Sequence, residues 1–272
     1  PHNSEIILNI YQDKKQASEV KDNVCTSLSS NQEYILMREY NFGAGRPDPS
    51  SFPSGELAKA AARVIAEHGT ALVNYPDGRG YTGLREIAAK RFERSEGQAV
   101  SLNEIVLTSG SMQAMQLITE AFAQPGETII VEEHTYGGSL GVFRGRQVQM
   151  ASAPIDGQGL IVDELEALLK RLTDAGTPPR FIYTIATHQN PTGSILPLER
   201  RKRLLELAKA YDTLVVDDHC YGDILFRSEP APPTLYTLDT DERVVYVASF
   251  SKILGPGVRL GYFMAPNDLQ GR

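Results

Sequence analysis

The sequence has few of the residues that mark extracellular, metal-binding or nucleic-acid-binding proteins. Cysteine occurs twice in 272 residues, at Cys25 and Cys220, which is too few for a disulfide framework or a zinc site. We therefore expect no metal centre and a reducing compartment, the cytoplasm. Acidic residues outnumber basic ones by 34 to 27, and the net charge of −7 argues against nucleic acid as a partner, because phosphate binding needs clustered Lys and Arg.

Long apolar segments are also missing. No run approaches the roughly eighteen residues that a membrane helix requires, so we expect no membrane partner. The first residues, Pro1–Glu5, have neither the basic nor the apolar stretch of a signal peptide. The composition, 41% hydrophobic and 22% charged, is typical of a folded chain with a sizeable core, and it excludes disordered, collagenous and coiled-coil proteins.

Beyond residue 53, helical and strand patterns alternate. Two amphipathic helices come first, one after Ser54 with apolar Leu57, Ala60, Ala61, Val64 and Ile65, and one after Thr82 with Leu84, Ile87, Ala88 and Phe92 on one face. Runs rich in β-branched residues then predict strands at Glu104–Thr108, Thr128–Glu132, Gln147–Ala151, Phe181–Ala186, Leu214–Asp217, Val244–Ala248 and Leu260–Ala265. Helical patterns separate most of these strands, at 111–123, 136–145, 162–173 and 198–211.

This alternation predicts an α/β fold, a three-layer α/β/α arrangement with a mostly parallel, mixed sheet. Residues 1–53 fit the pattern poorly, and we expect an N-terminal arm there. The α/β domain is predicted at 54–265, followed by a short segment at 266–272. Ligands of such sheets bind at the carboxyl ends of the strands, so the loops that follow the strands carry the functional signal.

Three of these loops carry features of a ligand site. The segment Ser109–Gln113 opens a helix after the first strand, and its small residues expose backbone N–H groups to an anion, although an ordinary helix cap is the alternative. After later strands come Tyr136, which can stack on a planar ligand or simply pack in its loop, and Asn190 in Asn190–Gly193, a donor or a plain turn former. His134 and His188 are interpreted as structural.

Two further loops carry charge. Asp217 and Asp218 end one strand, and because side chains alternate along a strand, one of the two can face a ligand cation while the other faces away, although a solvated loop is the alternative. Lys252 lies among small residues with Arg259 seven positions later, a pattern that favours a Schiff-base amine and a phosphate-binding guanidinium. Together the loops predict a ligand with a phosphate, an aromatic ring, a basic ring nitrogen, a phenolic oxygen and an aldehyde, which is pyridoxal phosphate.

From about Asn41 onward the chain resembles the class I/II aminotransferases, a family of fold-type I pyridoxal-phosphate enzymes. The resemblance rests on Ser109-Gly110-Ser111, Asn190-Pro191-Thr192-Gly193, Asp218-x-x-Tyr221 and Ser249-x-Ser251-Lys252 with Arg259. It is nearest to the subgroup of kynurenine/2-aminoadipate aminotransferases and MocR-type regulators, with which it shares the motifs His-Gln-Asn-Pro-Thr-Gly and Asp-Asp-x-x-Tyr.

The resemblance implies a role for each matching residue. It implies that Lys252 forms the Schiff base and moves the proton, that Asp218 rather than Asp217 holds the ring nitrogen protonated, and that Tyr221 and Asn190 bind the phenolic oxygen. The remaining implied cofactor contacts are Tyr136 on the ring face and, around the phosphate, Ser109, Gly110, Ser111, Met112, Gln113, Ser249, Ser251, Arg259 and Tyr75, the last from a partner subunit. Gly45 is implied to lie near the substrate carboxylate, together with Asn190.

The function that the resemblance implies is transfer of an amino group from an L-amino acid to a 2-oxo acid by a ping-pong mechanism in a homodimer. Two alternatives stay open: another reaction on the same scaffold, such as a lyase, decarboxylase or oxidase, or the effector domain of a MocR-type regulator. Family members also continue into a smaller C-terminal domain with an Arg for the substrate carboxylate. The chain ends at Arg272 without that domain, so we expect either a fragment or a shortened member.

Overall fold

The computed structural model describes residues 45, 48–75, 77–224, 230–266 and 269. The chain divides into two compact units, Pro1–Ala44 and Gly45–Arg272, and everything below concerns the second unit. Most of the predicted arm at 1–53 therefore lies outside the described residues, and so does most of the segment predicted at 266–272.

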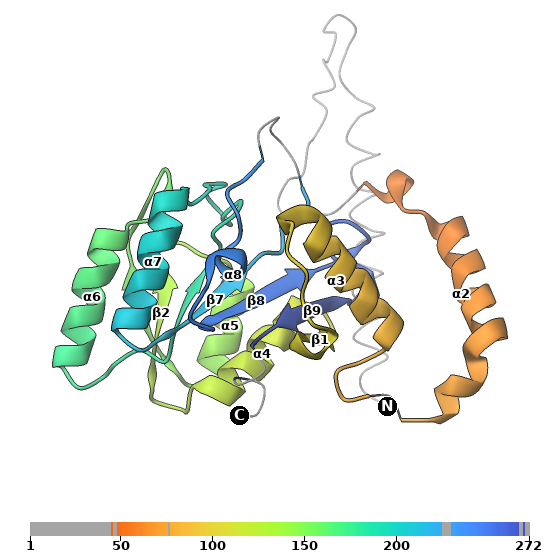
Figure 1. Cartoon of the computed structure of the whole chain (residues 1–272), viewed down its shortest axis with the longest axis horizontal. Coiled ribbons are helices and arrows are strands. Elements are labelled where there is room, and N and C mark those ends of the chain that lie inside the picture. Colours follow the sequence, from red (N-terminus) through yellow and green to blue (C-terminus); the bar gives the residue numbers. More distant parts are fainter. Residues whose placement is uncertain (1–44, 46–47, 76, 225–229, 267–268, 270–272) are drawn as a thin grey trace, which may run out of the picture. The chain divides into compact units, whose positions relative to one another are not determined.

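A seven-stranded sheet forms the centre of the second unit, in the order β1-β9-β8-β7-β6-β2-β3 (Figure 1). Its strands are β1 (Ile105–Thr108), β2 (Thr128–Glu132), β3 (Gln149–Ala153), β6 (Phe181–Thr184), β7 (Leu214–Asp218), β8 (Val244–Ser249) and β9 (Gly261–Met264). The pairs from β3 through β8 are parallel, whereas β9 is antiparallel to both of its neighbours, β1 and β8. The predicted mostly parallel, mixed sheet is confirmed.

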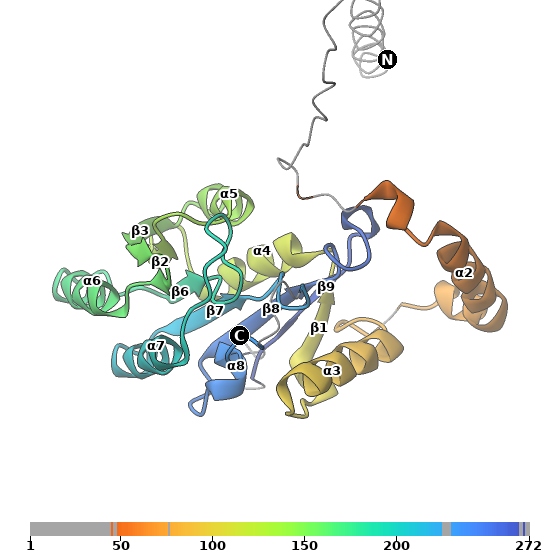
Figure 2. The same ribbon diagram turned by 90° about the horizontal axis from the view of Figure 1, so that it is seen from above.

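Helices cover both faces of this sheet, as Figure 2 shows. On one face lie α4 (Ser111–Phe122) and α5 (Gly137–Gly145), and on the other lie α3 (Thr82–Glu96), α6 (Val162–Asp174), α7 (Leu198–Ala210) and the short α8 (Leu235–Leu238). Each layer buries its own apolar cluster against the strands: Met115 and Phe143 on the first face, Leu165 and Leu204 under α6 and α7. The three-layer prediction is therefore also confirmed.

Some element boundaries differ from the prediction. The strand expected at Gln147–Ala151 begins at Gln149, because Gln147 still belongs to the turn after α5, with a φ of 59°. A small hairpin, β4 (Ile155–Asp156) with β5 (Gly159–Leu160), and helix α8 were not predicted. Segments of two to four residues are too short to show a hydrophobic period.

The buried face of α3 differs from the predicted one. Ala88 and Phe92 are buried as expected, but Ile87 is 52% exposed and Arg85 is only 4% exposed. The buried residues of α3 are thus Arg85, Ala88 and Phe92, so the buried face includes a cation that the apolar pattern did not predict.

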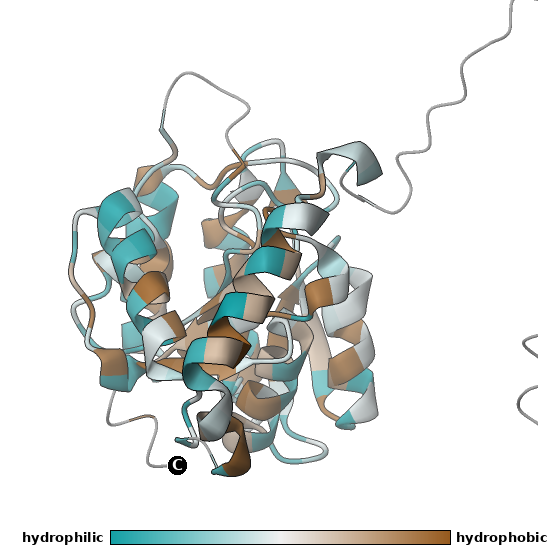
Figure 3. Ribbon diagram, turned by 90° about the vertical axis from the view of Figure 1, so that its right-hand side faces the viewer, coloured by the Kyte–Doolittle hydropathy of each residue, from teal (hydrophilic) through white to brown (hydrophobic). Residues whose placement is uncertain are grey.

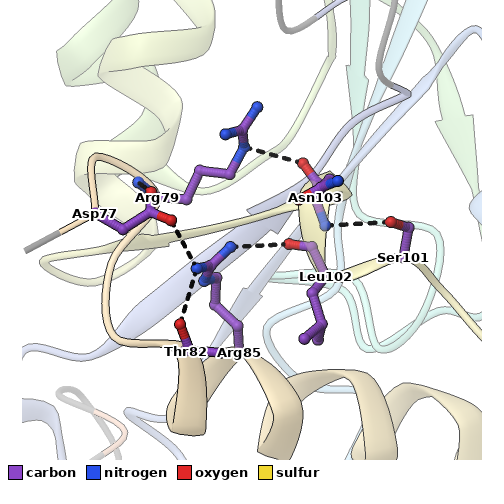
Figure 4. Close-up of polar contacts among 7 residues, drawn as sticks. All are labelled: Asp77, Arg79, Thr82, Arg85, Ser101, Leu102 and Asn103. Atoms are coloured by element: carbon purple, nitrogen blue, oxygen red, sulfur yellow. Dashed lines mark hydrogen bonds and ion pairs between the residues drawn. The ribbon is translucent and has the colours of Figure 1, made fainter.

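Arg85 is buried because its guanidinium has partners (Figure 4). It donates to the backbone oxygen of Leu102 at 3.2 Å, to Asp77 Oδ2 at 2.9 Å and to Thr82 Oγ1 at 3.2 Å. Arg79 adds a bond from its Nε to the backbone oxygen of Asn103, at 3.1 Å. These bonds anchor the loop before α3 to the segment before β1.

The first predicted helix forms as α2 (Ser54–His68), followed by the 3-10 turn Gly69–Val73. None of its residues is buried, and Val64 and Ile65 expose 50% and 61% of their surface. Figure 3 shows hydrophobic residues along this helix on the side turned to the viewer. Within the described residues, the amphipathic pattern of α2 therefore has no apolar surface that buries it. The described helices include none long and apolar enough to cross a membrane.

Candidate functional site

The predicted site residues gather at one edge of the sheet. Strands β1, β2, β6, β7 and β8 point the same way, so the segments that follow them meet at their carboxyl ends. This edge receives the Ser109 loop after β1, Tyr136 after β2, Asn190 after β6, Asp218 at the end of β7 and Ser249 at the end of β8.

Lys252 lies in the turn that follows β8, and its side chain is half-buried. Its Nζ donates to the backbone oxygen of Gly45 at 3.2 Å and lies 5.5 Å from the centroid of the Tyr221 ring. No carboxylate of the described residues forms an ion pair with Lys252. The amine is therefore held by a neutral oxygen and an aromatic face, which leaves it accessible to an incoming carbonyl group.

Asp218 is a buried carboxylate whose two oxygens differ in their hydrogen bonding. Its Oδ2 accepts a hydrogen bond from the Tyr183 hydroxyl at 2.8 Å, and that hydroxyl lies 3.0 Å from Ser139 Oγ of α5. Its Oδ1 is buried and makes no hydrogen bond of ordinary geometry with the described residues, although the backbone N–H and the thiol of Cys220 lie close enough to lower the pKa of this carboxyl. Burial raises the pKa of Asp218, against the opposing effect of Cys220 and Tyr183. A buried unpaired oxygen of this kind costs about 1–3 kcal/mol, which a bound N–H cation would recover.

Asp217 faces the opposite layer of helices. Its Oδ2 accepts from the backbone N–H of Leu235, the first residue of α8, at 3.3 Å. Burial raises the pKa of Asp217 to about 7, although the positive charge of Arg201 works against this rise. The two adjacent carboxylates therefore lie on different faces of the sheet, as the alternation of a strand predicts.

Asn190 lies in the loop that follows β6, Tyr221 lies in the loop that follows β7, and their side chains are in contact. The Asn190 Nδ2 donates to the Tyr221 hydroxyl at 3.1 Å, and His188 Nδ1 lies 3.2 Å from the Tyr221 backbone oxygen. Burial raises the pKa of the Tyr221 hydroxyl, while the bond from Asn190 lowers it. The amide and the phenol thus form a pair of donors beside Lys252.

The N-terminus of α4 lies beside the guanidinium of Arg259. Gly110 caps this helix with a φ of 78°, and a Cβ there would clash with the Arg259 Nη2. Glycine is therefore required at this position, both for the backbone conformation and for the close approach of the guanidinium. Arg259 donates from Nη2 to the Ser109 backbone oxygen at 3.1 Å. The positive helix terminus and the guanidinium together favour a phosphate group.

The other predicted contacts surround these groups. Tyr136 precedes α5, and its partly exposed ring lies against Gly138, where a Cβ would come within 2.5 Å of it. Ser111 and Met112 are half-buried in the first turn of α4, and the backbone N–H of Ser251 donates to Ser249 Oγ at 3.1 Å. The Gln113 side chain instead accepts from the Ser109 backbone N–H at 2.6 Å, which turns it back onto its own loop.

Tyr75 lies in the loop between the 3-10 turn Gly69–Val73 and α3. Its side chain is fully exposed. Two residues later the chain is anchored by Asp77, which accepts from the Arg79 backbone N–H at 2.8 Å and from Arg85 (Figure 4). The exposed Tyr75 therefore lies two residues before a position that hydrogen bonds hold in place.

Three polar residues of the site were not predicted: Glu132, Tyr183 and Gln189. All three are buried, and each contacts a loop or a carboxylate described above. The sequence held a sign of the role of Glu132: it is an acidic residue at the end of an otherwise apolar strand, and a buried acid needs hydrogen-bond donors around it. Tyr183 carried none, because a tyrosine in a β-branched run is an ordinary strand residue.

The fold and this edge of loops define a class of protein, the fold-type I α/β proteins. Residues 39–270 match the family model described as aminotransferase class I and II, and the chain belongs to this family. It is 37% identical to aromatic-amino-acid aminotransferase 1 of Thermococcus litoralis over 225 residues, which are 83% of this chain and 54% of that protein. The chain spans about half the length of the curated relatives it matches.

Solved structures agree with this assignment. Kynurenine aminotransferase from Pyrococcus horikoshii superposes with a TM-score of 0.77 at 35% identity, covering 84% of this chain and 56% of the other. LysN, the alpha-aminoadipate aminotransferase of Thermus thermophilus, gives 0.76 at 34% identity, covering 85% and 57%. That structure is complexed with N-(5'-phosphopyridoxyl)-L-leucine.

Proposed function

We propose that this chain binds pyridoxal phosphate and catalyses the transfer of an amino group from an L-amino acid to a 2-oxo acid. One observation carries the proposal: the buried Asp218 Oδ1 makes no hydrogen bond of ordinary geometry with the described residues, at the edge where Lys252 and Arg259 also lie. A protonated pyridine nitrogen supplies the donor that this oxygen needs. Membership of the class I and II aminotransferases supports the same cofactor and reaction.

The donor set fits each part of the cofactor. The Arg259 guanidinium and the N-terminus of α4 would hold the phosphate, with Ser111 and Ser249 beside them. Tyr136 would lie on the ring, and the Asn190 and Tyr221 pair would bind the phenolic oxygen. When bound, pyridoxal phosphate supplies an aldehyde that joins covalently to amines and a ring that delocalises the electron pair left when an α-proton departs.

The protein's own residues would then act on protons and charge. Lys252 Nζ would hold the cofactor covalently, and as a free amine it would take up the α-proton of the substrate and give it back. The Asp218 carboxylate would keep the ring nitrogen protonated through Oδ1, while the Tyr183 hydroxyl donates to Oδ2. Asn190 and Gly45 would lie beside the substrate carboxylate. The cytoplasmic location that we propose rests on the scarcity of cysteine.

The direct test adds pyridoxal phosphate to the purified protein. We expect a visible absorption band, and reduction with borohydride should leave the cofactor on the peptide that contains Lys252. A panel of L-amino acids then identifies the reaction. An aminotransferase without a second substrate returns one oxo acid and one pyridoxamine phosphate for each site, whereas a lyase releases ammonia over many turnovers. A protein with no band and no modified Lys252 would disprove the proposal.

We also propose that the active unit is a homodimer in which Tyr75 binds the phosphate held by the partner subunit. The exposed ring on an anchored loop supports this reading. Tyr75→Ala should weaken cofactor binding about tenfold. When Tyr75→Ala and Lys252→Ala chains are co-expressed, each mixed dimer should contain one intact site, so about a quarter of wild-type activity should return.

A matched pair of variants controls this experiment. Lys252→Ala with Asp218→Asn places both defects in residues of one subunit's site, so mixed dimers of these chains should recover no activity. The assay uses a cofactor concentration that saturates the wild type but not Tyr75→Ala. If both mixtures stay equally inactive, Tyr75 does not act across a subunit interface.

A further inference from the structure

Glu132 ends strand β2 and is only 2% exposed, yet hydrogen bonds reach both of its carboxylate oxygens. Its Oε1 accepts from Thr184 Oγ1 at 2.6 Å and from the Ile185 backbone N–H at 3.1 Å. Its Oε2 accepts from Thr135 Oγ1 at 3.0 Å and from Gln189 Nε2 at 2.9 Å. One carboxylate therefore joins the end of β2, the end of β6 and the loops that follow both strands.

The amide of Gln189 is as fully bonded as this carboxylate. Besides Glu132, its Nε2 donates to the His134 backbone oxygen at 2.5 Å. Its Oε1 accepts from the backbone N–H of Thr192 at 2.9 Å and from the Thr192 hydroxyl at 2.8 Å. A backbone oxygen only accepts and a backbone N–H only donates, so these partners fix which end of the amide faces Glu132.

The two loops joined in this way carry the groups that flank the predicted cofactor. Gln189 immediately precedes Asn190, and Thr135 immediately precedes Tyr136. The backbone before Gln189 is also constrained, because His188 has a φ of 54°, a left-handed conformation that a non-glycine residue holds only when its surroundings impose it. Hydrogen bonds of Glu132 to Ile185 and to Gln189 hold the chain on either side of His188.

We infer that Glu132 and Gln189 are positioning residues that hold Asn190 and Tyr136 at their places around the cofactor ring, although neither touches the cofactor. The inference rests on the proposed function, since it assigns these residues a role at that site. The ionised form of Glu132 suits the arrangement, because the Ile185 and Gln189 N–H groups can only donate to it. Burial raises the pKa of Glu132, and its four bonded partners act against this.

Substituting Glu132→Gln breaks the arrangement whichever way the new amide turns. With its NH2 group toward Gln189, two donors face each other, and with the group reversed it faces the backbone N–H of Ile185. Gln189→Glu instead places a carboxylate against Glu132 and the His134 backbone oxygen, so acceptors face each other. The double variant restores a donor and an acceptor between positions 132 and 189, although the carboxylate at position 189 still faces the His134 backbone oxygen.

The experiment measures three quantities for each variant: the Kd for pyridoxal phosphate, the pH midpoint of the bound cofactor's visible band, and the Tm of the cofactor-free protein. Each single variant should bind the cofactor about tenfold more weakly and shift the pH midpoint, because Asn190 moves relative to the phenolic oxygen. The double variant should recover most of both changes, which would demonstrate the coupling of the two positions.

Thr213→Val serves as the matched control. Thr213 is fully buried at the opposite end of β7, and its hydroxyl donates to the Pro179 backbone oxygen at 2.9 Å. Its loss should lower the Tm while leaving the Kd and the pH midpoint unchanged. If the Glu132 and Gln189 variants behave like Thr213→Val, their role is confined to stability and the inference is wrong.

Thr135→Val keeps the test decisive if the Glu132 variant does not fold. It removes one donor to Glu132 without introducing charge, and should weaken cofactor binding about threefold. An unchanged Kd in this folded variant would overturn the inference. A wild-type protein that binds no pyridoxal phosphate would instead refute the proposed function, and that outcome appears before any variant is compared.

Discussion

Lys252→Ala should give a protein that shows no visible band with pyridoxal phosphate and no transfer of amino groups. The substitution removes the only nitrogen at the site that we assign to covalent attachment and to movement of the α-proton, so the rate should fall by about 10⁴-fold or more. The Nζ contacts, to the Gly45 backbone oxygen and the Tyr221 ring, contribute little to stability. Activity and absorbance should therefore be lost from a protein with a nearly unchanged Tm.

Lys209→Ala is the matched control for this variant. Lys209 lies on α7 and pairs with Asp241 at 2.6 Å, on a partly exposed surface. Its removal changes the net charge by the same amount and should leave both the band and the rate at wild-type levels. A Lys252→Ala enzyme that keeps its visible band would contradict the assignment.

Asp218→Asn should retain bound cofactor and slow the reaction about 10³-fold, because an amide lacks the negative charge that keeps the ring nitrogen protonated. The neighbouring substitution, Asp217→Asn, alters the same functional group one position away on the opposite face of β7. It should leave the rate close to that of the wild type. Measuring kcat for both variants with the amino acid found in the substrate panel decides the assignment, and equal rates for Asp218→Asn and wild type would exclude it.

Asp217→Asn should still change how stability depends on pH. Burial raises the pKa of Asp217 in the folded protein from 3.8 to about 7, so the folded state keeps a proton that the unfolded chain releases. The contribution of this group to stability is present below the unfolded pKa and is lost as the pH rises through the folded one. Relative to wild type, the variant should therefore be less stable at pH 5 than at pH 8, as urea unfolding at the two pH values would show.

The sequence predicted the fold well wherever an element was long and regular. The buried runs at Thr128–Glu132 and Val244–Ala248 became β2 and β8 almost unchanged, because only strands between two helix layers bury every side chain. The face of α3 was predicted less well, since the guanidinium of Arg85 is buried by partners more than twenty positions apart in the sequence, from Asp77 to Leu102. Such long-range pairing leaves no local pattern.

In the candidate site, too, the residues that belong to local motifs could be predicted, whereas those paired over a long distance in the sequence could not. Asp218 ends β7, and Lys252 and Arg259 lie in the segment that connects β8 to β9, so their arrival at one edge of the sheet follows from topology. Glu132 and Gln189 lie 57 positions apart, and nothing near either residue indicates the other. The structure adds these supporting contacts, whereas the groups proposed to touch the cofactor were already visible in the sequence.

Among the described strands of the sheet, β9 comes last along the chain, yet it lies inside the sheet, between β1 and β8. While the chain is being made, β1 and α3 emerge long before the strand that joins them to the rest of the sheet, and β8 keeps an open edge until then. The same delay applies to the phosphate site, because Arg259 and Ser109 are 150 positions apart. A nascent chain must therefore keep an open strand edge from aggregating until β9 has left the ribosome, and the proposed phosphate site is assembled only then.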